Sequence, residues 1–333
     1  MRNLADLLNI LVSSAGRRSL IIEYFKKELR GRGRVIACDC STLAPALYAA
    51  DKHYIVPRID DPGYFDAIMD ICTKEEIRAV ISLIDPELSI LAKRQKELEQ
   101  IGAMPIVSPY ETCELWFDKY AAYCFLIANG FKAARTYATL SDFEDDIDAG
   151  LVDFPVILKP RKGSASINIS KAEKIEEVRN LFSSRSGMLI QEYINGKELG
   201  VDAYVDIISR DITAMFAKEK LAMRAGETDK ARSICPEGLF PAVEALARYS
   251  GLIGPIDMDI FYYKGEYLIS EVNPRFGGGY PLANECGVNF PRYILNNLSG
   301  IVNEPETGNY EIDVYMMKHD VLMIRKEIGI GTI

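Results

Sequence analysis

Between residues 10 and 107 the sequence alternates short apolar runs with stretches of helical periodicity, and no other feature constrains the fold as strongly. Runs of strand length stand at residues 10–13, 35–38, 54–56, 79–84 and 105–107. Segments with helical periodicity separate them, at residues 19–29, 43–50, 64–73 and 87–101. Buried strands separated by amphipathic helices are typical of βαβ units. We therefore predict an α/β chain whose first domain, residues 1–115, is a doubly wound parallel sheet.

The pattern changes after Trp116. A helix is expected at residues 119–129, and strands at 154–159 and 167–170 flank a Gly/Ser loop, which together predict a small lobe over residues 116–195. Longer strand candidates follow at residues 198–208, 213–219, 257–263 and 266–272, with a helix at 241–249. They predict a larger lobe, residues 196–333, with a metal site and a C-terminal tail. No internal repeat or low-complexity linker interrupts the chain, so we expect one compact body.

Composition narrows the classes of partner. The 333 residues carry 39 Lys and Arg against 48 Asp and Glu, a net charge of −9, and contain no basic run. A nucleic-acid surface is therefore not expected, and small molecules are the expected partners. The apolar stretch at residues 10–12 is too short for a signal peptide or a membrane span, so we expect a cytoplasmic protein that does not enter a membrane.

Histidine and cysteine give no sign of a site. The two histidines, His53 and His319, lie far from any acidic or Cys cluster in the sequence, so the chemistry is expected to proceed without histidine. The seven cysteines are scattered, and core thiols are the favoured interpretation.

The strongest local motif runs from Tyr267 to Gly279. On a strand, Glu271, Asn273 and Arg275 alternate onto one face. A carboxylate and an amide oxygen are hard ligands suited to Mg²⁺, and an arginine beside them can bind phosphate oxygens. A turn near residues 264–265 would place Asp259 opposite Glu271 in a hairpin. The alternative is a solvated hairpin face with a stray salt bridge.

Two lysines are candidate phosphate ligands. Lys159 ends an apolar run and is followed by the loop of Gly163, Ser164, Ala165 and Ser166, whose N–H groups could approach an anion closely. Lys119 begins the predicted helix and could offer a second cation. Each signal is weak alone, because a Gly/Ser loop is often a plain turn and Lys119 could be an ordinary surface lysine. The P-loop motif occurs nowhere in the chain.

A strand, a turn and a second strand are expected between residues 188 and 202. The segment Glu192, Tyr193 and Ile194 could give an adenine main-chain hydrogen bonds and an apolar slot, with Glu198 placed for ribose hydroxyls. A simple hairpin with charged tips is the alternative.

The order of these pieces resembles the ATP-grasp superfamily, and most closely one ATP-grasp half of carbamoyl phosphate synthetase large subunits. The resemblance covers nearly the whole chain up to Gly279. It implies that Lys119 and Lys159 hold phosphates of ATP, that residues 192–194 form the adenine hinge, and that Glu198 holds ribose. It also implies that Asp259, Glu271 and Asn273 bind Mg²⁺, with Mn²⁺ as an alternative ion, and that Arg275 stabilises the transferring phosphoryl group.

Two departures from the synthetases concern the substrate. Asp259 stands where the synthetases have Gln, which preserves an oxygen ligand and adds negative charge. The chain holds a single grasp module, so production of carbamoyl phosphate by this chain alone is not expected. The resemblance implies an ATP-dependent ligase that activates a carboxylate as an acyl phosphate and joins it to an amine or a similar nucleophile. A synthetase-like subunit that needs a partner and a non-catalytic ATP-binding sensor remain alternatives.

Two further segments have open roles. The loop expected at residues 220–232, with Arg224 as a candidate catalytic residue, could close over substrate as a lid or remain a solvated loop. The turn at Gly16, Arg17 and Arg18 could bind an anionic substrate at the carboxyl end of the sheet, or be a basic surface turn. Because Gly16 is the only glycine near the first strand, dinucleotide binding is disfavoured. Association of identical copies is left open.

Overall fold

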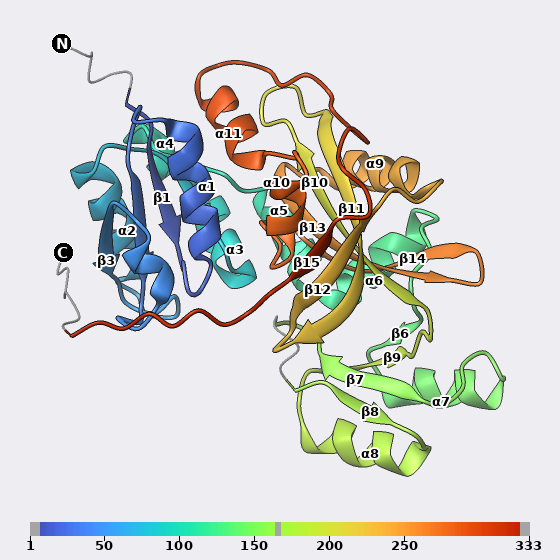
Figure 1. The fold of residues 1–333 in the computed structure, drawn as a ribbon. Helices are drawn as coiled ribbons and strands as arrows, with labels where there is room; N and C mark the ends of the chain where they lie inside the picture. Colours follow the sequence, from blue (N-terminus) through green and yellow to red (C-terminus); the bar gives the residue numbers. More distant parts are fainter. Residues whose placement is uncertain (1–6, 164–167, 327–333) are drawn as a thin grey trace.

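The first domain is an open parallel sheet, as predicted. The computed structural model describes residues 7–163 and 168–326. Five strands pair in the order β3-β2-β1-β4-β5 (Figure 1). Their bounds are β1 Asn9–Ser13, β2 Val35–Asp39, β3 Lys52–Ile55, β4 Ile77–Ser82 and β5 Met104–Pro105. All of these pairs are parallel, and the order reverses beside β1, which makes the sheet doubly wound.

Helices cover both faces of this sheet. One face packs under α1 (Ser19–Leu29), and the other packs under α2 (Tyr64–Lys74), α3 (Asp85–Lys93) and α4 (Gln95–Gln100). The helix expected at residues 43–50 is wrong, because only a 3₁₀ turn, η2 (Pro45–Tyr48), forms there. Ala44 is extended ahead of Pro45, and β3 begins soon afterwards, which leaves no room for a longer helix. The helix expected at residues 87–101 is two helices, since Arg94 leaves helical geometry between them.

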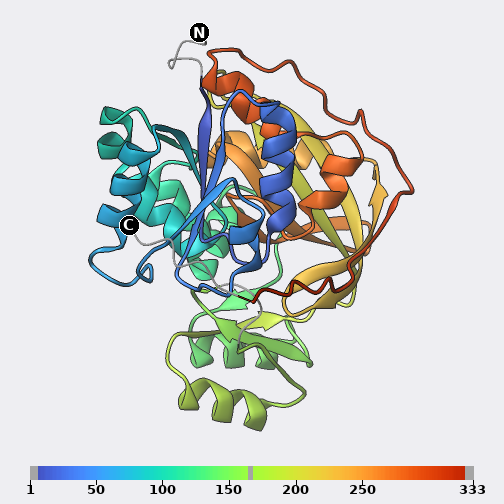
Figure 2. The same cartoon turned by 60° about the vertical axis from the view of Figure 1, so that its left-hand side comes forward.

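The middle of the chain forms the small lobe. Helices α5 (Tyr110–Phe117) and α6 (Lys119–Ala128) lead into it. Its antiparallel sheet has the order β6-β9-β7-β8, with bounds β6 Thr136–Tyr137, β7 Val156–Pro160, β8 Ser170–Ala172 and β9 Met188–Glu192. Helices α7 (Leu140–Asp148) and α8 (Ile175–Ser184) pack on this sheet, and the lobe projects from the rest of the molecule (Figure 2).

The large lobe is built on a second antiparallel sheet, ordered β14-β13-β10-β11-β12-β15. The strand bounds are β10 Lys197–Val205, β11 Ile212–Arg224, β12 Glu227–Ile234, β13 Gly254–Tyr263, β14 Glu266–Asn273 and β15 Tyr315–Met317. Helix α9 (Leu239–Ser250) covers one face of the sheet. The β13–β14 hairpin pairs Asp259 with Glu271, which is the register that the sequence predicts.

The loop expected at residues 220–232 is wrong. The strands β11 and β12 continue through this segment and meet in a two-residue turn at Ala225 and Gly226, whose φ values are 49° and 74°. Two successive residues of positive φ are typical of the hairpin turns that match the twist of the flanking strands. The turn is not recognisable from the sequence pattern, because it contains a single glycine and the residues around it are charged.

The C-terminal part joins the large lobe to the first domain. Helix α11 (Phe290–Leu298) packs with α10 (Tyr280–Glu285) in the core cluster that also contains α1. Beyond it, residues 302–326 form a strap that adds β15 to the edge of the large sheet and then runs back toward the first domain (Figure 1). At its end the Arg325 guanidinium lies 5.1 Å from the ring centroid of Tyr48. Among the described residues, no helix is long and apolar enough to cross a membrane.

Candidate active site

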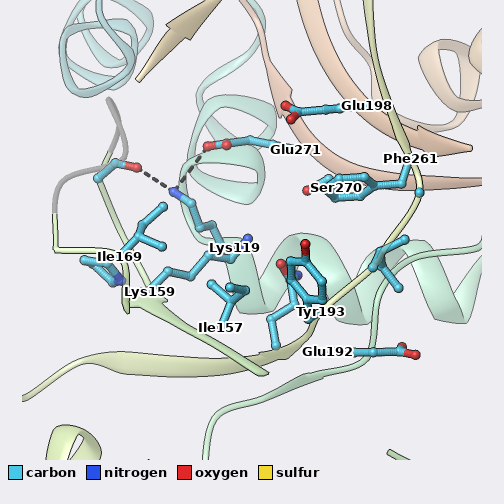
Figure 3. Close-up of a pocket in the computed structure, with 15 residues that line it drawn as sticks. Lys119, Ile157, Lys159, Ile169, Glu192, Tyr193, Glu198, Phe261, Ser270 and Glu271 are labelled. Atoms are coloured by element: carbon cyan, nitrogen blue, oxygen red, sulfur yellow. Dashed lines mark hydrogen bonds and ion pairs between the residues drawn. The ribbon is translucent and has the colours of Figure 1, made fainter. Parts of the chain in front are cut away.

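A cavity of about 380 Å³ opens where the small and large lobes meet (Figure 3). This is an ordinary volume for a small-molecule site. Eight residues predicted from the sequence line it: Lys119, Lys159, Gly163, Glu192, Tyr193, Ile194, Glu198 and Glu271. Residues Ser164, Ala165 and Ser166, predicted to contact phosphate, lie outside the described residues.

Lys119 and Lys159 supply the positive charge of the cavity. Lys119 is the first residue of α6, which is capped by the Asp118 carboxylate. Its Nζ lies 3.2 Å from Glu271 Oε1 and donates to the Gly163 carbonyl (Figure 3). Lys159, on β7, is 7% exposed. Burial lowers the pKa of Lys159, and Lys119 lowers it further, against the opposing effect of Glu271. An anion in the cavity would therefore stabilise both charged lysines.

Apolar side chains that the sequence analysis did not select form another part of the wall. Ile157, Ile169 and Phe261 line the cavity with Ile194. A signal for two of them exists in the sequence. Ile157 stands two residues before Lys159, and Phe261 two residues after Asp259, so strand alternation places each on the same face as its neighbour.

The predicted hinge lies between β9 and β10, as a strand, a turn and a strand. The Glu192 carboxylate accepts a hydrogen bond from the Arg135 backbone N–H at 3.2 Å, so this side chain holds the strand pairing between β6 and β9. Figure 3 shows the Glu192 carboxylate directed away from Lys119 and Glu271. The Glu192 backbone N–H is also engaged, since it donates to the Arg135 carbonyl at 2.9 Å. Tyr193 remains 41% exposed.

The three predicted metal ligands share the β13–β14 hairpin. Asp259 and Glu271 are cross-strand partners and are partly exposed, whereas Asn273 is buried. Asn273 and Glu271 line a narrow second cleft beside Lys119. Among the described residues no three His, Cys, Asp or Glu side chains are grouped to hold a metal ion by themselves. Two carboxylates and an amide fit Mg²⁺ when phosphate oxygens or water complete its coordination.

Lys220, on β11, was missed by the sequence analysis. Its Nζ lies 2.9 Å from Glu198 Oε1 and also bonds the Asp259 carboxylate. The lysine is 3% exposed, and although burial lowers its pKa, Asp259 and Glu198 raise it more, so the ammonium stays charged. Lys220 thereby ties the residue predicted for ribose to a residue predicted for the metal.

Arg275 does not line the cavity. It is 9% exposed, its Nη2 donates to Asp85 Oδ2 at 3.0 Å, and its Nη1 donates to the Phe276 carbonyl at 2.9 Å. Asp257 Oδ2 lies 3.7 Å from Nη1. Gly277 packs on these charges, since a Cβ there would lie 2.3 Å from Asp257 Oδ1.

Arg224 lies away from the cavity. It ends β11, is half exposed, and bonds Asp229 and Asp320. Near that hairpin, Arg17 and Arg18 from the turn after β1 face Glu227. Among the described residues, the structure gathers those predicted for the nucleotide and separates both candidate catalytic arginines from the cavity wall.

Two family models match the chain. A PylC-like N-terminal domain model matches residues 10–106, and an ATP-grasp domain model matches residues 117–279. The carbamoyl-phosphate synthase of Methanobrevibacter smithii is 28% identical over 75% of this chain and 70% of its own length. A carbamoyl phosphate synthase large chain of Helicobacter pylori is 21% identical over 78% of this chain but only 25% of its own length.

A solved structure has the same fold. The biotin carboxylase of Campylobacter jejuni in complex with β-γ-ATP has a TM-score of 0.72 and 16% identity, over 92% of this chain and 74% of that one. The two matched models are adjacent and in the order that the structure shows. The chain therefore contains an ATP-grasp domain, preceded by a PylC-like N-terminal domain.

Proposed function

We propose that the chain is an ATP-dependent ligase that binds Mg-ATP between the small and large lobes, activates a small carboxylate as an acyl phosphate, and joins it to an amine. The observation that carries the proposal is the arrangement of Lys119 and Lys159 around Glu271 in one cavity of ligand size. Cations beside a carboxylate of the predicted metal set fit the phosphate end of a metal-bound nucleotide.

The rest of the cavity fits the other parts of ATP. Ile157, Ile194 and Phe261 offer apolar contact to an adenine, and the main chain at residues 192–194 offers it hydrogen bonds. Glu198 would hold ribose hydroxyls, with its carboxylate oriented by Lys220. Residues 164–166 are also proposed to contact phosphate, and this part of the proposal is based only on the sequence pattern.

Asp259, Glu271 and Asn273 would hold Mg²⁺, or Mn²⁺ in its place. The ion supplies neutralisation of the charge that develops on the transferring phosphoryl group. Lys119 and Lys159 orient and neutralise phosphate oxygens from the other side. This division of roles needs no histidine base, because positioning and charge neutralisation provide most of the catalysis in phosphoryl transfer.

Arg275 is proposed to stabilise negative charge at the carboxyl end of β14. Its contacts with Asp85 and Asp257 hold it in a fixed orientation next to the end of the metal-binding strand. Arg224 is the weaker candidate for this role, because it lies at the hairpin tip and is already bonded to Asp320.

The names of the relatives favour a second candidate, a synthase-like subunit that needs a partner chain. Two relatives are carbamoyl phosphate synthases, and this chain spans only a quarter of the longer one. Under this proposal ATP binds as before, but transfer of its γ-phosphoryl group to bicarbonate, which releases ADP, occurs only when the partner is added. Under the ligase proposal, this chain alone transfers the γ-phosphoryl group of ATP to a carboxylate and releases ADP, and the amine then displaces phosphate from the acyl phosphate.

Ligand-induced stabilisation tests the nucleotide site. Mg-ATP should raise the melting temperature of the wild-type protein and NAD should not, because a ligand that binds only the folded state stabilises it. Lys159→Met should reduce the Mg-ATP shift to a small fraction of the wild-type value. Lys132→Met, which removes an exposed lysine paired with Glu266, is the matched control and should keep the full shift. Equal shifts for ATP and NAD would rule out the proposed site.

A further inference from the structure

Three cations from two distant parts of the chain converge on Glu227, outside the nucleotide cavity. Arg17 Nη2 lies 3.1 Å from Glu227 Oε2, and Arg18 Nη2 lies 3.6 Å from Oε1. Lys318 Nζ lies 3.2 Å from Oε2. Both arginines follow β1 of the first domain, and Lys318 comes from the C-terminal strap. Glu227 itself opens β12 in the large lobe.

Positive charge exceeds negative charge in this cluster. The neighbouring carboxylates have other partners: Asp85 and Asp257 pair with Arg275, and Asp320 pairs with Arg224. Burial lowers the pKa of Arg18 and of Lys318, and the nearby Arg275 lowers that of Arg18 further. Glu227 opposes both shifts without cancelling them. A second anion beside these cations would therefore be favourable.

The cluster lies beside the strand end that carries the proposed metal ligands. The Phe276 carbonyl accepts hydrogen bonds at 2.9 Å from both Arg18 and Arg275. A Cβ at Gly278 would lie 3.0 Å from the Glu227 carboxyl carbon, so this carboxylate rests against the glycine turn. Arg17 and Arg18 also stand at the carboxyl end of β1, where open α/β sheets bind ligands.

We propose that Arg17, Arg18 and Lys318 form a subsite for an oxyanion of the carboxylate substrate, which accepts the phosphoryl group. The Glu227 carboxylate takes the place of that oxyanion when no substrate is bound. The inference rests on the proposed ligase function and specifies its substrate class. The substrate is a small acid or amino acid that carries an anionic group, carboxylate or phosphate, in addition to the carboxylate that becomes activated.

The subsite has a purely structural alternative, in which Glu227 only neutralises a contact between domains. The change in anion affinity caused by one substitution distinguishes the subsite from the structural alternative. If Glu227 stands in for a substrate oxyanion, Glu227→Gln removes a competitor and raises anion affinity, by about tenfold for the removal of about 1.4 kcal/mol of competing interaction. If the role is structural, the substitution leaves anion affinity unchanged.

The experiment measures binding of inorganic phosphate and of succinate by calorimetry, without nucleotide. Glu227→Gln should bind the preferred probe about tenfold more tightly than wild type. Arg17→Gln and Lys318→Gln should each bind it about tenfold less tightly. The preferred probe identifies the oxyanion as a phosphate or a carboxylate.

The chain offers a matched control for each charge. Glu219→Gln removes a carboxylate that also bridges two cations, Arg232 at 2.8 Å and Lys197 at 3.7 Å, and should not increase affinity. Arg58→Gln removes an exposed surface arginine and should not reduce it. Equal gains in Glu227→Gln and Glu219→Gln, or no loss in the exposed Arg17→Gln variant, would overturn the subsite.

The Mg-ATP melting shift separates this inference from the proposed function. All variants of the cluster should keep the wild-type shift, because the cluster does not line the nucleotide cavity. Absence of the shift in wild type would contradict the nucleotide site itself. If the Mg-ATP melting shift is normal and anion affinity does not change when Arg17, Lys318 or Glu227 is substituted, the subsite alone is overturned.

Discussion

Arg275 and Asp85 are 190 residues apart in the sequence and form an ion pair across the boundary between the first domain and the large lobe, with Nε 2.8 Å from Oδ1 and Nη2 3.0 Å from Oδ2. Asp85 is the first residue of α3, and Arg275 follows the strand that carries Glu271 and Asn273. Both side chains are about nine-tenths buried. The pair therefore fixes the end of the proposed metal-binding strand against the first domain.

Loss of the Arg275 side chain should reduce both stability and turnover. Arg275→Ala leaves Asp85 and Asp257 buried without their cation, which should cost about 3 kcal/mol in the free energy of unfolding. Substrate-dependent ADP release should fall by about two orders of magnitude or more, while ATP affinity stays within about tenfold. Urea denaturation and nucleotide titration measure the two effects. Arg248→Ala, which removes an exposed ion pair with Glu244 within one helix, is the control.

The proposed metal ligands should control the divalent-ion requirement. Glu271→Gln and Asp259→Asn remove ligand charge with little change of volume, so each should raise the Mg²⁺ concentration for half-maximal activity by about tenfold or more. Glu266→Gln, on the same hairpin but exposed and paired with Lys132, should titrate like wild type. Identical Mg²⁺ curves for all four proteins would mean that Asp259 and Glu271 only form a hairpin face.

Ionisation of Glu227 should make the free energy of unfolding depend on pH in the acid range. Burial raises the pKa of Glu227, but Arg18, Lys318 and Arg17 lower it more, so the net pKa is below its ordinary value of 4.5. A depressed carboxyl pKa stabilises the folded state above the unfolded pKa, and this stability is lost as pH falls through the folded value. Wild type should exceed Glu227→Gln by about 2 kcal/mol at pH 7, the scale of hydrogen bonds to a charged group. The difference should vanish progressively below pH 4.5. A difference that is constant with pH would contradict the ionised cluster.

The sequence predicts those parts of the fold and candidate site that depend on local periodicity. Alternation along β14 and the turn before it give the pairing of Asp259 with Glu271, because strand geometry and hairpin register are local properties. The same period could have identified Ile157 and Phe261. The triple glycine is recognisable as unusual, but its physical reason is the close approach of Asp257 to Gly277 and of Lys218 to Gly279, which only the folded structure reveals.

Contacts between distant segments could not be predicted. Nothing local links Arg275 with Asp85, or Glu227 with Arg17, because each pair depends on how the domains pack. Lys220 was missed for a similar reason, since its role depends on β11 lying beside β10 and on the reach of its side chain to β13. Pattern analysis places residues relative to one another only where they share a strand or a hairpin.

Formation of ADP by the wild-type chain, in the presence of Mg-ATP, small acids and amines, tests the ligase proposal most directly. The proposal predicts ADP that depends on a carboxylate, and hydroxylamine should trap the acyl phosphate as a hydroxamate. Carboxylate substrates that carry a second anionic group should be preferred if the Arg17, Arg18 and Lys318 subsite is correct. If Mg-ATP raises the melting temperature while broad screening gives neither ADP nor hydroxamate, the proposal of a ligase that acts as this chain alone is wrong, and a partner-dependent subunit or an ATP-binding sensor takes its place.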